Sequence, residues 1–257
     1  GHGLAVSLIA KQRYDWGLDW SLGYAYTDQT DVSPMTSSVA SSNFNNLALS
    51  SLVDPRAATS NYVSPHRFTA RISYAREFIP GHETRITAFM FSKEGQPQSH
   101  VMSSSDLEGD QRYGRHLLYV PSPNGDDNVV IQPGFDTAGW NTFLKTNGYE
   151  QYAGGFVPRN ARHTRWSNRM DLRIDQELPL FFGTQARAYL KIYNVLNMLN
   201  DSWGRQYDSY FYSQAVVTSS VDGDGRYVFE NFRNRGLTDL RENASLYEIR
   251  LGVQFEF

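Results

Sequence analysis

The chain of 257 residues contains no cysteine, so disulfides, thiolate metal ligands and a cysteine nucleophile are all excluded. It also lacks a surplus of either charge, because 24 Lys and Arg face 27 Asp and Glu. This balance argues against a nucleic-acid-binding protein with a strongly basic surface. No uninterrupted apolar run exceeds four residues, whereas a transmembrane helix needs about 20. A β-structure that crosses a membrane with strands is not excluded.

Aromatic residues are abundant at 14 %, and many of them follow a period of two that indicates β-strands. The segment from Asp15 to Tyr26, DWGLDWSLGYAY, places apolar side chains at every second position. Several alternating stretches are longer than the usual strand of about five or six residues. The expected strands cover residues 3–14, 15–26, 67–78, 84–94, 165–178, 185–199 and 245–257.

Each alternating strand has one apolar and one charged face, and Arg76 is the one charge on the apolar faces of the five clearest strands. We expect the apolar faces to meet membrane lipid, at Trp16, Leu18, Trp20, Leu22, Phe68, Ile72, Leu172 and Ile174. We expect the other faces to line the lumen of a barrel, with charges at Arg71, Arg169, Asp171, Arg173, Asp175, Glu177, Glu248 and Arg250.

Two expected strands alternate less clearly than the others. In residues 84–94, Phe89 and Phe91 lie on the face opposite Ile86. In residues 185–199, Tyr189 and Tyr193 likewise lie on the face opposite the other apolar residues. Either a β-bulge or aromatic side chains inside the lumen would explain the pattern.

The connections between the expected strands alternate between short turns and long loops. The long ones span residues 27–66, 95–164 and 200–244, and compact soluble domains avoid structureless connections of that length. Transmembrane barrels have short periplasmic turns and long extracellular loops. The sequence therefore predicts an all-β fold, the C-terminal segment of a large transmembrane β-barrel with about seven antiparallel strands.

The strand number predicts further strands outside this sequence. Bacterial single-chain barrels have even strand numbers, so upstream strands are expected before Gly1. The last strand also has the right length: ten steps from Tyr247 to Phe257 span roughly 33 Å, or about 25 Å across the membrane after tilting. That is the height of an outer-membrane apolar band.

The final stretch, residues 244–257, resembles the C-terminal strand of Gram-negative outer-membrane barrels, which ends in an aromatic residue after alternating apolar ones. This resemblance implies outer-membrane lipid and the barrel-assembly machinery as partners. The recognition face it implies is Tyr247, Ile249, Leu251, Val253, Phe255 and Phe257.

Further stretches are similar to TonB-dependent transporters, particularly the Oar-like subgroup: HLLYVPS (116–122), residues 158–179, and YLKIYNVLNMLN (189–200) followed by Trp203 and Gly204. The resemblance implies a barrel of roughly 22 strands in the bacterial outer membrane, of which these are the last seven. It also implies an N-terminal plug that contacts TonB. Neither the plug nor a TonB-contacting segment is recognised in this sequence.

Catalysis and cofactors are not indicated. The six histidines, at 2, 66, 82, 100, 116 and 163, lack metal-ligand spacing, and Asp222 to Gly225 fits a turn better than a calcium site. The row of acidic residues in 165–178 fits a ladder of lumen charges, so we predict no enzyme activity, no cofactor and no nucleic-acid partner. For Asn194 and Asn197, which interrupt a strand, a family motif is preferred over a bulge or turn.

Three functions follow from the expected barrel. The first is a TonB-dependent receptor for energy-coupled uptake of a scarce, unidentified solute. The second is a passive porin-like channel, which needs an open lumen and no plug. The third is a barrel-anchored surface adhesin or secretion partner. A soluble β-sandwich is a further alternative. The sequence identifies no ligand-binding residues for any of them.

Overall fold

The computed structural model describes residues 1–103, 107, 114–181, 184–208, 213–233 and 239–256. The fold is mostly β, with 52 % strand and 13 % helix, and its main sheet is antiparallel. The described strands do not close into a barrel. None of the described helices has the length and apolar character needed to cross a membrane.

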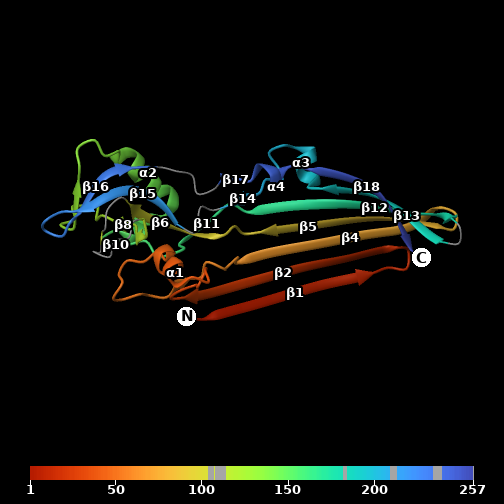
Figure 1. The fold of residues 1–257 in the computed structure, drawn as a ribbon, viewed down its shortest axis with the longest axis horizontal. Coiled ribbons are helices and arrows are strands. Elements are labelled where there is room, and N and C mark those ends of the chain that lie inside the picture. The colour runs from red at the N-terminus through yellow and green to blue at the C-terminus, as the bar shows by residue number, and fades with distance from the viewer. Residues whose placement is uncertain (104–106, 108–113, 182–183, 209–212, 234–238, 257) are drawn as a thin grey trace.

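One long sheet forms half of the molecule (Figure 1). Every neighbouring pair in it is antiparallel, and the short strand β3 (Ala58–Thr59) pairs with β2 at one end. In spatial order its long strands are β1 (Gly3–Arg13), β2 (Leu18–Asp31), β4 (His66–Ile79), β5 (His82–Lys93), β12 (Ser167–Phe181), β13 (Thr184–Tyr193) and β18 (Glu248–Glu256).

These strands overlap the seven expected ones but differ at several ends. Strand β2 continues to Asp31, beyond the expected end at Tyr26, and β12 continues to Phe181, beyond the expected end at residue 178. Trp16 lies in the turn before β2 and not in the strand, because the chain reverses through Gly17 at φ 100°. The strand expected over 185–199 ends at Tyr193, and residues 195–199 form helix α3 (Val195–Leu199). Tyr247 precedes β18, while Phe257 lies outside the described residues.

The long connections are not structureless, which corrects the argument from their length. Much of residues 97–163 and 213–232 forms a second folded unit, called here the loop domain. Its elements are β6 (Pro97–Ser103), β7 (His116–Leu117), β8 (Tyr119–Val120), β9 (Val129–Ile131), α2 (Thr137–Asn147), η1 (Tyr149–Tyr152), β10 (Gly155–Phe156), β11 (Arg162–His163), β15 (Ser213–Val221) and β16 (Tyr227–Phe232). Helix α1 (Ala40–Asn46) lies in the first connection.

The hydrophobic core lies in the loop domain and not beneath the long sheet. Met102, Leu118, Val157, Val216 and Phe229 are completely buried there. Within the described residues of the seven long strands, Ala186 is the one buried hydrophobic residue. The long sheet therefore has no apolar core of its own on either face.

The connections segregate to opposite ends of the long sheet. Its short turns lie at one end with the C-terminus, and α1 and the loop domain lie beyond the other end (Figure 1). The small elements β14 (Tyr207–Asp208), β17 (Asp239–Leu240) and α4 (Glu242–Ser245) lie near the loop end of β12. The end with the long connections is called here the loop end.

Candidate functional site

The strand register gathers the expected lipid-facing residues on a single face, called here the apolar face. Residues paired directly across antiparallel strands share a face. Ile72 pairs with Ala88 and Ala88 with Leu172, and this row continues through Ile192 to Ile249. A parallel row contains Leu18, Tyr74, Ile86, Ile174, Leu190 and Leu251.

The apolar face is not covered by a second layer of protein. Ile72 is 50 % exposed, Ile249 54 % and Leu251 82 %. Phe68 and Leu22 are exposed as well, whereas Leu18 and Trp20 are partly covered by their neighbours in the sheet. Large exposed apolar surfaces mark contact with a membrane or a partner.

Aromatic clusters lie at both ends of the apolar face. At the loop end, the ring of Phe68 lies 4.8 Å from Tyr24 and 6.2 Å from Trp166. At the turn end, the ring of Trp16 lies 6.0 Å from Tyr74. Trp16 lies in the turn before β2, and Tyr24 lies six steps along the strand from Leu18, or about 20 Å. The apolar face therefore has an aliphatic centre between two groups of aromatic side chains.

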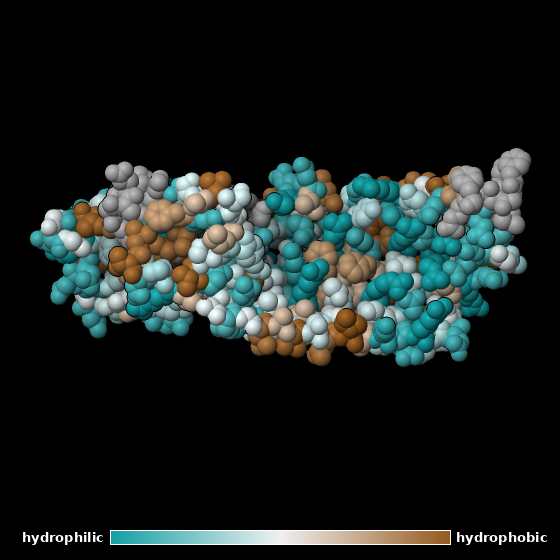
Figure 2. All heavy atoms as spheres, turned by 60° about the horizontal axis from the view of Figure 1, so that its bottom comes forward, coloured by the Kyte–Doolittle hydropathy of each residue, from teal (hydrophilic) through white to brown (hydrophobic). Residues whose placement is uncertain are grey.

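The opposite face, called here the charged face, holds all eight residues expected to line a lumen. Short ion pairs run along it: Arg173 Nε lies 2.6 Å from Asp175 Oδ2. Similar contacts join Arg169 to Asp171 at 2.8 Å, Arg187 to Glu177 at 2.8 Å, Arg71 to Asp19, and Arg250 to Glu248. In Figure 2, hydrophilic residues cover much of the molecule's turn end, and hydrophobic residues gather along the lower edge.

Aromatic side chains on the charged face account for the two irregular strands. Phe89 pairs with Arg71, and Tyr189 with Asp175, without a bulge at either position. The guanidinium of Arg173 lies 4.9 Å from the ring centre of Tyr189, and Lys191 Nζ lies 5.3 Å from it. Cation–π contacts thus hold the Tyr189 ring among charges.

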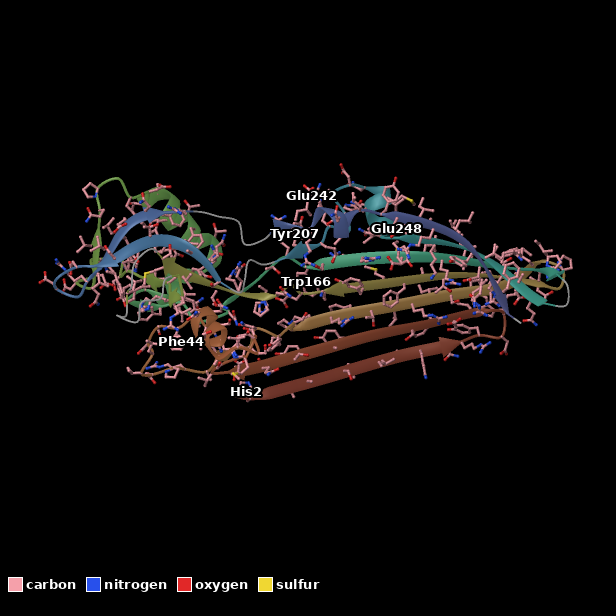
Figure 3. All side chains as sticks on the ribbon, viewed as in Figure 1. His2, Phe44, Trp166, Tyr207, Glu242 and Glu248 are labelled. Carbon is pink, nitrogen blue, oxygen red and sulfur yellow. The ribbon has the colours of Figure 1, made fainter. Side chains whose placement is uncertain are left out.

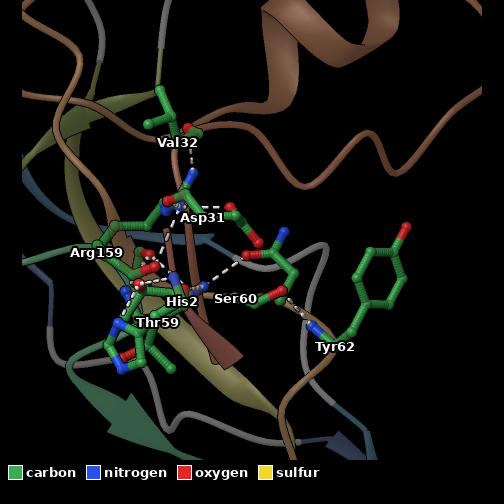
Figure 4. Close-up of polar contacts among 12 residues, drawn as sticks. His2, Asp31, Val32, Thr59, Ser60, Tyr62 and Arg159 are labelled. Atoms are coloured by element: carbon green, nitrogen blue, oxygen red, sulfur yellow. Dashed lines mark hydrogen bonds and ion pairs between the residues drawn. The ribbon is translucent and has the colours of Figure 1, made fainter. Parts of the chain in front are cut away.

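Arg159 and Asn160 join the loop domain to the long sheet, and Figure 4 shows Arg159 beside Asp31 and Val32. The Arg159 side chain, 4 % exposed, donates to Asp31 Oδ1 at 2.7 Å and to the Val32 carbonyl at 3.0 Å. Burial lowers the pKa of Arg159, and the nearby Asp31 opposes this shift. Asn160 donates to the Thr59 carbonyl at 2.7 Å. No sequence pattern indicated this junction, apart from the family resemblance of residues 158–179.

A hollow of about 270 Å³ opens where the charged face meets the loop end, and is called here the mouth pocket. Trp166 and Tyr207 are labelled in Figure 3 near this end of the long strands. The pocket is lined by Ser64, Phe91, Lys93, Glu94, Gly95, Gln96, Ser167, Arg169, Gln206, Tyr207, Arg241 and Ala244. Five separate parts of the chain contribute to it, so local sequence patterns could not reveal it.

The charges in the mouth pocket are unequal, with Lys93, Arg169 and Arg241 against Glu94. Glu94 Oε1 also lies 3.6 Å from His163 Nδ1. Burial lowers the pKa of His163, although Glu94 opposes the shift. Of the lining residues, the sequence identified Arg169 as a lumen charge and named Phe91 as a possible lumen aromatic.

The expected assembly signal forms part of an exposed edge strand. Leu251, Val253 and Phe255 are all more than half exposed, and β18 pairs on one side with β13. Tyr247 is also exposed, just before the strand.

A scan of protein-family models and searches of curated proteins and solved structures found no match.

Proposed function

We propose that this chain is part of an outer-membrane β-barrel receptor that takes up a scarce solute by coupling to TonB. The observation that carries the proposal is the two-faced long sheet, which has an exposed apolar face with aromatic clusters at both ends and a charged face behind it. Water does not stabilise so large an apolar surface, whereas hydrocarbon does. The charged face then lines an aqueous lumen.

The open edges of β1 and β18 also support this reading. Unpaired backbone groups at a sheet edge are not tolerated in lipid, so in a membrane both edges need partner strands. Further strands of the same barrel would supply them. The loop domain, which stands beyond one rim of the sheet, suits capture of a solute before it enters the barrel.

A surface adhesin is the second candidate, because the loop domain has a buried core of its own. Such a core would hold a binding surface in shape without any transport. A transporter removes a solute from the medium, whereas an adhesin does not.

The test compares solutes left in the growth medium by the parent strain, a strain lacking this gene and a strain lacking TonB. We expect the full-length protein in the outer-membrane fraction, and at least one solute whose depletion needs both the gene and TonB. Outer-membrane location with identical depletion in all three strains would contradict uptake and favour adhesion. Recovery of the protein from the cytoplasm would contradict the barrel itself.

A further inference from the structure

We infer that the mouth pocket binds an organic oxyanion, a carboxylate or phosphate group attached to an apolar body. This inference rests on the proposed function, because it names the class of solute that the receptor would admit. It is argued from the charge, the walls and the position of the pocket.

The charge of the pocket is opposite to that of the chain. The whole sequence carries a net charge of -3, yet the pocket lining contains three cationic side chains and one carboxylate. Lys93 forms no ion pair with any described residue. The single carboxylate, Glu94, has His163 as a neighbour. Arg169 already pairs with Asp171, so Lys93 is the lining cation from which an anion would gain a charge partner.

Arg165 extends the positive field beyond the lining. Its guanidinium lies 5.3 Å from the ring centre of Tyr207, which forms part of the pocket wall. It belongs to a stretch from Arg159 to Arg169 that contains four arginines and no acidic residue. Within this stretch Arg159 and Arg169 pair with Asp31 and Asp171, so Arg165 is the cation that it adds beside the pocket wall.

The remaining walls suit the body of an organic solute. Phe91 and Tyr207 offer aromatic surface, while Gln96, Gln206 and Ser167 offer polar groups. The Gln206 side chain is held in place by bonds to the Asn168 and Gly204 carbonyls, at 3.2 and 3.3 Å. Binding sites for small molecules combine apolar walls with few oriented polar groups in this way. The volume suits a small solute or one end of a larger one.

The test measures the affinity of three fluorinated probes for the full-length protein in detergent, by ¹⁹F NMR. The probes are 4-fluorobenzoate, 4-fluorophenyl phosphate and the uncharged 4-fluorobenzamide. We expect at least one anion to bind about tenfold more tightly than the amide. The difference should shrink as the salt concentration rises. The carboxylate and phosphate probes show which oxyanion is preferred.

Matched variants locate the site. Lys93→Gln and Arg241→Gln should each weaken anion binding by about fivefold or more and leave amide binding unchanged. The control, Lys145→Gln on the exposed surface of α2, removes the same charge elsewhere and should have no effect. Equal affinity for anion and amide, or unchanged anion binding in both pocket variants, would overturn the inference.

The two proposals fail separately. An outer-membrane protein that takes up a solute but binds neither anion would overturn the oxyanion site alone. A protein that binds the anions through Lys93 but is absent from the outer membrane would overturn the proposed function alone.

Discussion

At the residue scale, Asn194 shows how a single side chain organises the end of a strand. It has a positive φ of 53°, which asparagine tolerates better than most residues, and it is completely buried. Its amide donates to the carbonyls of Gly204 and Ser245, at 3.0 and 2.6 Å. A Cβ on Gly204 would lie 2.1 Å from the Asn194 side chain. Asn194 therefore lies in a turn at the end of β13, and the family motif stays a prediction.

His100 makes the loop domain sensitive to acid. Burial, with the positive charge of Arg162 as a smaller cause, lowers its pKa to about 4. Its Nδ1 shares a hydrogen bond of 2.7 Å with the Tyr149 hydroxyl. The folded pKa lies below the unfolded value near 6.5, so the unfolded state binds the proton first as pH falls. The stabilisation that depends on neutral His100 is fully present above about pH 6.5. As the pH falls towards 4 it is lost, and the free energy of unfolding decreases by roughly 3 kcal/mol.

This dependence is measured as the thermal unfolding midpoint of the loop domain by near-UV circular dichroism, near pH 7 and near pH 4. We expect a lower midpoint in acid for the parent protein. In His100→Gln, which has no titrating group at this position, the difference between the two conditions should shrink. The same acid sensitivity in both proteins would assign it to other groups.

At the scale of the element, the alternation of apolar and polar residues predicts the long strands. The aromatic residues that break this alternation are explained by the residues beside them on neighbouring strands. Phe89, Tyr189 and Tyr193 lie among charges, and Tyr193 has the guanidinium groups of Arg169 and Arg250 at 5.6 and 5.1 Å from its ring centre. Gly252 leaves room for Tyr189, since a Cβ there would lie 2.5 Å from the ring. Alternation alone cannot show this pairing, because the partners lie on other strands.

A charge introduced into β18 tests which solvent meets each face. Leu251, near the middle of the strand, is 82 % exposed on the apolar face, and Gln254 lies on the charged face opposite Arg187. If hydrocarbon covers the apolar face, Leu251→Lys should cost about 2 to 4 kcal/mol. Gln254→Lys should cost less than about 1 kcal/mol, because a lumen charge stays hydrated.

The measurement is the free energy of unfolding of the full-length protein from lipid vesicles, by denaturant titration. Similar small costs for both substitutions would show that water meets both faces, and the proposed barrel would then be wrong.

At the scale of the whole molecule, two parts are stabilised in different ways. The loop domain has a buried core of aromatic and aliphatic residues, including Trp140 and Phe143 with ring centres 5.9 Å apart. The long sheet has paired backbones and an exposed apolar face. The loop domain can therefore be stable in water, whereas the exposed apolar face of the sheet is unfavourable in water.

Arg159 fixes these two parts to each other, so its removal should loosen the junction. Arg159→Ala leaves the Asp31 carboxylate without its buried partner, at a cost of about 3 kcal/mol. We expect faster proteolysis within residues 27–66, followed by mass spectrometry. Arg56→Ala is the matched control, because that arginine pairs with Asp54 at the surface of the same connection. Equal cleavage rates in both variants would show that Arg159 is not the fastening residue.

The sequence by itself determined the long strands, their two faces and the alternation of short and long connections. These properties depend on the period of the apolar residues and on the lengths of the connections, both of which are visible in the sequence without knowing which strands pair. Only the tertiary structure decided the loop domain, the Arg159 junction and the mouth pocket. Lys93, Tyr207 and Arg241 lie far apart along the chain, and each is unremarkable alone. Their proximity arises from strand register and from loops packing over the sheet end, which single-sequence patterns do not encode.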